Sequence, residues 1–290
     1  RWPRGSRRWR RPGRSGLRDV IAELKRSSYK AVIFVSKKPK IFIAGADIEE
    51  IEGLKTPEDV NKAVQGGQEV FNELEDLPIV TIAAVNGACA GGGCEFIMAC
   101  DYRIASEDSS TRIGLPETKL GIIPGFGGCV RMPRIMGLQA SLDVILNGKL
   151  LNPKKAEKAG LVDQVVHPSI LMETAVKWAK EKAGQKRRKT FKAQGLPNVL
   201  LEGIAKGVVF SQARKTVLKM THGHYPAPLK AIEVIKKTYG MSDRSRALQI
   251  EREGFIECAL TPISKNLIHV FYLTEMVKKQ TGVADTKVKA

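Results

Sequence analysis

Two acidic residues beside a glycine run are the part of this sequence best equipped for chemistry. Glycines occupy positions 91–93, Glu95 follows them, and Glu117 comes 22 residues later, directly after Pro116. Glycines allow backbone N–H groups to come close to a ligand, and two carboxyl groups can act as general acid and general base. Each glutamate alone also has an ordinary explanation, at a helix N-terminus or in an exposed loop.

A second turn of small residues lies upstream, where Ala44, Gly45, Ala46 and Asp47 follow an apolar segment. Two backbone amides that converge on one carbonyl oxygen, with two carboxylates beside it, form a site for chemistry on an activated acyl group. A tight strand-to-helix turn is the alternative explanation of the glycine run. A phosphate loop fits less well, because no Gly-Lys-Ser/Thr sequence accompanies the glycines.

The elements that must position these residues alternate between strands and helices. Apolar and β-branched runs predict strands at 31–36, 41–43, 79–85, 102–105, 111–114 and 161–166. Helical spacing and turn signals predict helices at 17–25, 57–77, 94–100, 129–136, 140–146 and 154–159. Thr56 is the expected N-cap of the second helix, and Asn86-Gly87 is expected to turn the chain after a strand. The repetition of strand, turn and helix indicates an α/β fold with crossover connections.

The predicted secondary structure changes in the second half of the sequence. Beyond residue 170 the strand signals stop, and helices are predicted at 170–184, 198–220, 227–239, 242–258 and 262–280. We therefore expect a basic arm at 1–16, a catalytic core at 17–190, a helical extension at 191–282 and a tail at 283–290.

The net charge of +18 is concentrated in two segments. Residues 1–16 hold seven arginines and no acidic residue, and residues 147–220 hold 16 Lys and Arg against five Asp and Glu. Such a surface suits an anionic ligand, either a phosphorylated cofactor or a nucleic acid. A solvated lysine-rich face that aids solubility is the alternative. The arm lacks the apolar stretch of a secretory signal.

The five cysteines and the hydropathy restrict the class of protein further. The odd number of cysteines, without any CxxC pair, predicts reduced thiols in a reducing compartment. Cys94 lies beside the proposed site, yet no histidine near it in sequence would activate it, so a packed thiol is favoured over a nucleophile. No run of about 18 apolar residues exists, so we expect no membrane span.

Six segments, in order along the chain, resemble the crotonase (enoyl-CoA hydratase/isomerase) superfamily. They lie at 44–48, 86–95, 100–105, 115–117, 120–128 and 156–162. The helical remainder, with the sequence Tyr-Pro-Ala-Pro-Leu at 225–229, resembles the region that follows the hydratase core in the α subunits of multifunctional fatty-acid oxidation enzymes. No GxGxxG fingerprint of the dehydrogenase domain of those enzymes is present. The resemblance implies a spiral of ββα units with a C-terminal helical region.

The resemblance also implies a reaction and roles for residues. An enoyl-CoA hydratase of fatty-acid β-oxidation would add water to trans-2-enoyl-CoA, with Glu95 activating the water and Glu117 delivering a proton to the α-carbon. The amides of Ala46 and Gly92 would form the oxyanion hole, where one donor is typically worth about 3–4 kcal/mol of barrier. The CoA moiety would pass Ala44, Asp47 and Ile48. The same site would also be compatible with the isomerisation of 3-enoyl-CoA.

Partners and alternatives follow from the same resemblance. The CoA thioester is the substrate, and we expect no cofactor and no metal; His222-Gly223-His224 lacks further ligands for one. The resemblance implies a homo-oligomer, commonly a trimer, or a complex with a thiolase subunit, in the bacterial cytoplasm or the mitochondrial matrix. Another crotonase-fold enzyme, an isomerase or hydrolase, stays open. So does an RNA-binding crotonase-fold protein, although few aromatics interleave with the basic stretch, which makes nucleic acid the less favoured partner.

Overall fold

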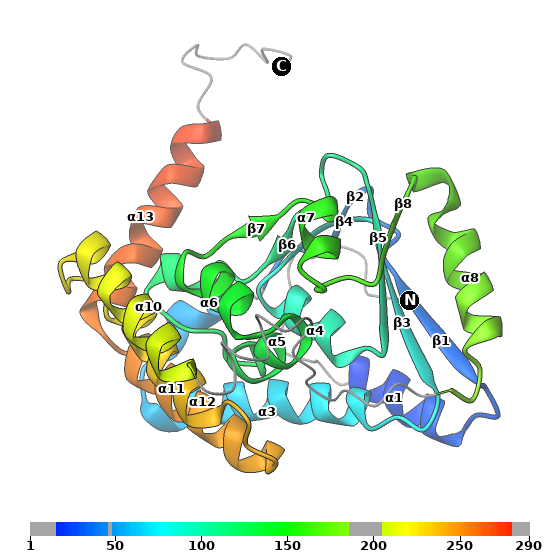
Figure 1. The fold of residues 1–290 in the computed structure, drawn as a ribbon, viewed down its shortest axis with the longest axis horizontal. Coiled ribbons are helices and arrows are strands. Elements are labelled where there is room, and N and C mark those ends of the chain that lie inside the picture. The colour runs from blue at the N-terminus through cyan, green and yellow to red at the C-terminus, as the bar shows by residue number, and fades with distance from the viewer. Residues whose placement is uncertain (1–15, 46–47, 186–204, 280–290) are drawn as a thin grey trace.

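The computed structural model describes residues 16–45, 48–185 and 205–279, and its elements alternate as predicted (Figure 1). The first helices are α1 (Leu17–Arg26), α2 (Ile48–Gly53), α3 (Pro57–Glu75) and α4 (Gly92–Ala99). The strands are β1 (Ala31–Val35), β2 (Lys40–Ile43), β3 (Val80–Val85), β4 (Gly87–Ala90), β5 (Tyr102–Ser106), β6 (Ile113–Gly114), β7 (Leu150–Leu151) and β8 (Gln164–Val166).

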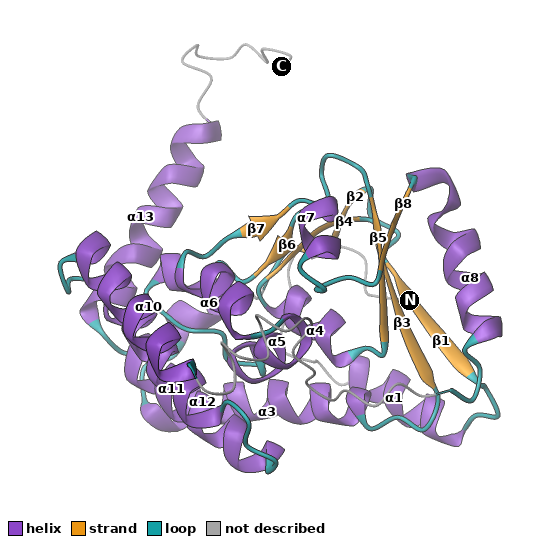
Figure 2. Cartoon of the chain, in the orientation of Figure 1, coloured by secondary structure: helices purple, strands orange, loops and turns teal. Residues whose placement is uncertain are grey.

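The later elements are almost entirely helical (Figure 2). They are the 3-10 turns η1 (Glu117–Leu120) and η2 (Pro168–Ile170), and the helices α5 (Gly128–Met136), α6 (Leu138–Leu146), α7 (Pro153–Lys158), α8 (Leu171–Glu181), α10 (Lys206–Thr221), α11 (Pro226–Thr238), α12 (Arg244–Ala259) and α13 (Pro262–Lys279). No strand follows β8 in the described part of the chain, as the sequence predicts. Residues 198–204 of one predicted helix lie outside the described residues.

Strands β1 to β6 alternate between two four-stranded sheets. One sheet has the order β1-β3-β5-β8 and is parallel throughout, and the other has the order β2-β4-β6-β7, in which only the β6–β7 pair is antiparallel. Each of the first three pairs of strands, β1–β2, β3–β4 and β5–β6, therefore adds one strand to each sheet before a helix or helical turn carries the chain onward. This winding is the predicted spiral of ββα units, with the helical region after it.

The parallel sheet is buried on both faces, as parallel sheets generally are. Side chains of β3 alternate: Ala83 and Val85 face the main core, whereas Ile82 and Ala84 pack on the other side with Leu171 of α8. Helix α8 covers that outer face of the sheet (Figure 1). Successive side chains of a strand point to opposite faces of the sheet. Because both faces are buried here, the sequence of β3 shows no alternation between apolar and polar residues.

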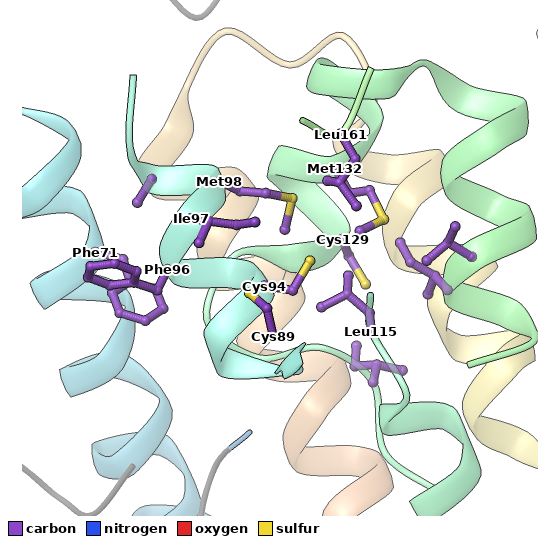
Figure 3. Close-up of a cluster of buried hydrophobic side chains, with 14 of the residues drawn as sticks. Phe71, Cys89, Cys94, Phe96, Ile97, Met98, Leu115, Cys129, Met132 and Leu161 are labelled. Carbon is purple, nitrogen blue, oxygen red and sulfur yellow. The ribbon is translucent and has the colours of Figure 1, made fainter. Parts of the chain in front are cut away.

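The main core lies between the sheets and the long helix α3. Figure 3 shows a cluster of its buried side chains, with Phe71 and Phe96 among them. Thr56 caps α3 as predicted, since its side-chain oxygen accepts from the Asp59 N–H at 3.1 Å. Phe71 of α3 meets Phe96 of α4 edge-on, with ring centroids 6.0 Å apart. Helix α12 packs on α3 and α5, helix α11 packs on α5 and α6, and both bury residues in this same core. The C-terminal helices thus help to hold α4 and α5 in place.

One sequence prediction about the turn after β3 is wrong. Asn86-Gly87 does not reverse the chain, because β4 begins at Gly87 and pairs in parallel with β2. The Asn86 side-chain amide instead donates to the carbonyls of Ser36 and Lys38, at 3.0 and 3.2 Å. It stabilises the connection between β1 and β2. The chain therefore passes directly from one sheet to the other at this point.

The short elements that were not predicted are α2, the strands β4 and β7, and the 3-10 turns η1 and η2. Within the described ranges, none of the helices has the length and apolarity needed to cross a membrane.

Candidate functional site

Glu95 is placed by the glycine run that precedes it. Gly91 is the N-cap of α4 with φ 56°, a value that favours glycine, and Glu95 follows in the first helical turn. Its side chain is only 2% exposed. One carboxyl oxygen, Oε1, accepts from the N–H of Phe126 at 2.7 Å and from the N–H of Gly128 at 2.8 Å. Two amides fix this oxygen, so Oε2 is the oxygen left for chemistry.

Glu117 opens the turn η1 and points at the same glycines. It is 9% exposed, and its Oε2 is buried and accepts no hydrogen bond from the described residues. Its Oε1 lies 3.1 Å from the point where a Cβ on Gly91 would stand. The next residue, Thr118, anchors η1 by donating to the carbonyl of Ile145 at 2.9 Å. A buried carboxyl oxygen without a partner is costly, which is typical of a group that awaits a ligand.

The small-residue turn after β2 lies beside these groups. The Cα of Gly45 is 3.6 Å from the same Cβ point on Gly91, so Gly45, Gly91 and Glu117 meet. Gly92 is the first residue of α4, and its N–H has no partner within the helix, as in every first helical turn. Ala44 is exposed and Ile48 opens α2. Ala46 and Asp47, predicted to bind the thioester oxygen and CoA, lie outside the described residues.

Burial raises the pKa of both carboxyl groups, and the charge of Glu95 adds to the shift at Glu117. Burial raises the pKa of Glu95 to about 7, against the opposing effect of the Gly128 and Phe126 amides and of Arg131. Burial, followed by the charge of Glu95, raises the pKa of Glu117 well above its usual range. The hydrogen bonds from two backbone amides favour the ionised form of Glu95, so Glu95 releases its proton before Glu117 does. A pair in which one carboxyl is ionised and the other protonated suits a base and an acid that work together.

A third buried carboxyl group near the site was missed in the sequence. Glu251 of α12 is fully buried and accepts from the N–H of Gly127 at 2.6 Å and of Cys129 at 2.8 Å. Burial and the charge of Glu95 raise the pKa of Glu251 to about 8, although the hydrogen bonds from those amides and the charge of Arg131 lower it. The sequence did contain a signal. Glu251 lies on the apolar face of α12, in helical register with Leu248 and Phe255.

The cysteines around the site are packed thiols, as expected. All five are buried and free of disulfides, and Cys89, Cys94 and Cys129 are among the labelled core side chains of Figure 3. Burial, above all other causes, raises the pKa of the Cys94 thiol well above its usual range. A thiol that resists ionisation is a poor nucleophile, so the chemistry of this site rests on its carboxyl groups.

Comparison with known proteins identifies the family of this site. The family model described as "Enoyl-CoA hydratase/isomerase" matches residues 14–195. The chain is 43% identical over 272 residues to the fatty acid oxidation complex subunit alpha of Shewanella amazonensis, and 43% identical over 276 residues to that of Shewanella halifaxensis. These alignments cover 92% and 93% of this chain but only 38% of either relative. The chain thus spans well under half the length of these curated relatives.

Solved structures agree on the fold. An enoyl-CoA hydratase from Bacillus anthracis superposes with a TM-score of 0.55 at 28% identity, covering 91% of this chain and 85% of that one. The human mitochondrial delta3-delta2-enoyl-CoA isomerase superposes with a TM-score of 0.62 at 24% identity, covering 91% of this chain and 88% of that one. At that identity the second likeness concerns the fold alone.

Proposed function

Because the chain belongs to the enoyl-CoA hydratase/isomerase family, we propose that it is an enoyl-CoA hydratase that adds water to trans-2-enoyl-CoA to give 3-hydroxyacyl-CoA. One observation carries the proposal: two nearly buried glutamates, Glu95 and Glu117, converge on the glycines at the start of α4. An isomerase needs one such carboxyl group, whereas addition of water uses both a base and an acid.

The proposed reaction assigns one proton transfer to each glutamate. Glu95, ionised first, takes a proton from water as the water oxygen bonds to C3 of the enoyl group. The electron pair of the double bond moves toward the thioester oxygen, and the Gly92 N–H stabilises the charge that develops there. Glu117 gives its proton to C2. Transfer of one proton from Glu95 to Glu117 restores the starting state, so the net change is the addition of one water molecule.

The remaining site residues complete this proposal. We assign the second oxyanion amide to Ala46, and contacts with CoA to Ala44, Asp47 and Ile48. Ile48 opens α2 directly after this loop, and Gly45 lies against Gly91, which supports a loop that faces the same thioester. No cofactor is needed for this chemistry, because the CoA thioester is itself the activated group.

We further propose that the protein works in fatty-acid β-oxidation and assembles with other chains. The printed name of the relatives, a subunit of a fatty acid oxidation complex, supports both points. The partner would be a thiolase subunit, or further copies of this chain in a trimer. The bacterial source of the relatives supports a bacterial cytoplasmic location over the mitochondrial matrix.

The division of the chain is part of the proposal. Residues 17–190 would form the catalytic core and 191–282 a helical extension, flanked by the arm 1–16 and the tail 283–290. Helices α10 to α12 bury apolar side chains in the main core, which supports an extension that stabilises the site.

Hydration of crotonyl-CoA, followed as loss of the conjugated thioester absorbance, tests the proposal. The wild type is compared with Glu95→Gln, Glu117→Gln and the control Glu253→Gln, whose side chain is exposed on α12. A hydratase loses most of its turnover with either site substitution and keeps it with the control. Turnover of a 3-enoyl-CoA that survives one of the two site substitutions, without hydration by the wild type, would instead identify an isomerase.

A further inference from the structure

Glu95 and Glu251 share four consecutive backbone amides at the start of α5. The N–H groups of Phe126 and Gly128 donate to Glu95, at 2.7 and 2.8 Å. Those of Gly127 and Cys129 donate to Glu251, at 2.6 and 2.8 Å. The donors thus alternate between two carboxyl groups that come from different helices, α4 and α12.

This alternation couples the two carboxyl groups mechanically. The Gly128 amide lies between the two amides held by Glu251, so it cannot rotate unless one of them moves. Gly127 has φ 106°, a value that favours glycine. A Cβ on Gly128 would stand 3.0 Å from Oε1 of Glu95. Both glycines are therefore required for the turn to bring its amides so close to the carboxylates.

Glu251 is itself held in place from the opposite side. The side-chain N–H group of Gln68, on α3, lies 3.3 Å from Oε1 of Glu251 and 2.9 and 3.0 Å from the carbonyls of Leu248 and Gly125. The Gln68 oxygen accepts from Arg252 at 3.0 Å, which fixes the orientation of the amide. Glu251 therefore has no freedom to swing away from the α5 amides.

We propose that Glu251 is a positioning residue for Glu95: it fixes the turn 126–129 so that two amides hold Oε1 of Glu95 and leave Oε2 for the reacting water. The inference rests on the catalytic role proposed for Glu95. The cost of a second buried carboxyl group beside the first is hard to explain by packing alone, because an apolar side chain would fill the same space without burying an ionisable polar group.

The charged and titratable groups around Glu95 come from four elements. Arg131 of α5 faces both carboxyl groups and pairs with Glu75 at 2.9 Å. Glu117 of η1, Glu251 of α12 and the thiols of Cys94 and Cys129 complete the set. The hydrogen bonds from the Gly128 and Phe126 amides lower the pKa of Glu95 more than the charge of Arg131 does, so the amides carry much of the stabilisation of a negative charge on Glu95.

The test compares wild type, Glu251→Gln and the control Glu253→Gln in hydration of crotonyl-CoA across pH. A glutamine side chain keeps one acceptor oxygen, so either Gly127 or Cys129 faces an N–H group instead of an acceptor, and the turn must shift. A displacement of that kind is expected to lower kcat roughly 10- to 100-fold with little change in KM. Weaker hydrogen bonds from the Phe126 and Gly128 amides raise the pKa of Glu95, so the acid limb of the kcat profile moves to higher pH.

A crystal structure of Glu251→Gln supplies a readout that does not depend on activity. Lengthening of the Phe126 or Gly128 contact with Glu95, together with the fall in kcat, supports the inference. Unchanged kcat, an acid limb that stays in place, or one that moves to lower pH overturns it, the last because Glu251 would then act through its charge. A wild type without hydratase activity defeats the proposed function alone, and the crystal structure then decides the positioning role.

Discussion

Oε1 of Glu117 lies 3.1 Å from the point where a Cβ on Gly91 would stand, so the carboxyl group approaches the start of α4 as closely as glycine permits. The backbone explains why glycine is required, since Gly91 has φ 56° and ψ −126°. A side chain at this position would therefore meet two obstacles, an unfavourable backbone conformation and the carboxyl group of Glu117.

The first prediction concerns this close approach. Gly91→Ala should lower kcat by at least tenfold, because Glu117 must move away, and should reduce stability by about 1–3 kcal/mol through backbone strain. Gly240→Ala is the matched control: Gly240 has φ 82°, with nothing within 4 Å of its Cβ point. It should lose stability to a similar degree while keeping its kcat. Equal kcat for both variants, measured with crotonyl-CoA, would contradict the proposed place of Glu117 in the site.

The second prediction is the pH dependence of kcat. Burial raises the pKa of Glu95 to about 7, so kcat should fall as pH drops through about 7 and the base becomes protonated. The pKa of Glu117 is raised well above its usual range by burial and by Glu95, so a second fall should occur at higher pH as the acid loses its proton. Rates measured from pH 5 to 10, corrected for spontaneous loss of substrate, test this. An acid limb near 4.3, the ordinary glutamate value, would be inconsistent with a buried base.

The third prediction concerns how Glu95 lowers the free energy of unfolding as pH rises. Between about pH 4.5 and 7 the folded protein retains a proton on Glu95 that the unfolded chain has released, so rising pH lowers the free energy of unfolding there. Glu95→Gln removes this effect and preserves the local contacts, because one oxygen accepts both amides. Its stability relative to wild type should grow by about 2–3 kcal/mol from pH 5 to pH 8.5.

Urea unfolding at the two pH values measures this difference. Glu253→Gln is again the control, because an exposed glutamate should show no comparable change with pH. A constant difference between Glu95→Gln and wild type at both pH values would mean that Glu95 titrates normally in the folded protein.

The sequence was sufficient for most of the fold because its local signals agree with its tertiary structure. The strand β3 is a continuous run of β-branched and small residues, and α3 begins with Thr56 as a cap and Pro57 at its first turn. The element β7 has only two residues, too few for any periodicity to appear. Asn86-Gly87 misled the prediction because a turn dipeptide was read without the sheet pairing that extends Gly87 into β4.

The site was predictable only in part, for a different reason. Glu95 and Glu117 stand close to glycines in the sequence, so their chemistry has a local signature. Glu251 does not: the two amides it binds lie 124 and 122 residues upstream. Its neighbours Arg252 and Glu253 make the segment look like an ordinary charged helix surface. Only its register with the apolar face of α12 separates it from them.

The last prediction uses two adjacent glycines of α3 that differ in their surroundings. A Cβ on Gly66 would meet nothing within 4 Å, whereas a Cβ on Gly67 would overlap the ring of Phe126. That ring also lies 3.5 Å from the Cβ point of Gly92, and the N–H of Phe126 donates to Glu95 at 2.7 Å. A displacement of Phe126 by a side chain on α3 should therefore disturb both Gly92, the proposed oxyanion donor, and Glu95, the proposed base.

Gly67→Ala should consequently lower kcat and destabilise the fold by about 1–3 kcal/mol, the usual cost of overpacking a core. Gly66→Ala should keep kcat and gain about 0.5–1 kcal/mol, because alanine is the better residue within a helix. Hydration rates and urea unfolding of the pair test this side by side, with each variant serving as the control for the other. If Gly67→Ala lost stability and yet kept kcat, the contact between Phe126 and Glu95 would be structural rather than catalytic, because the displaced ring would have left the base undisturbed.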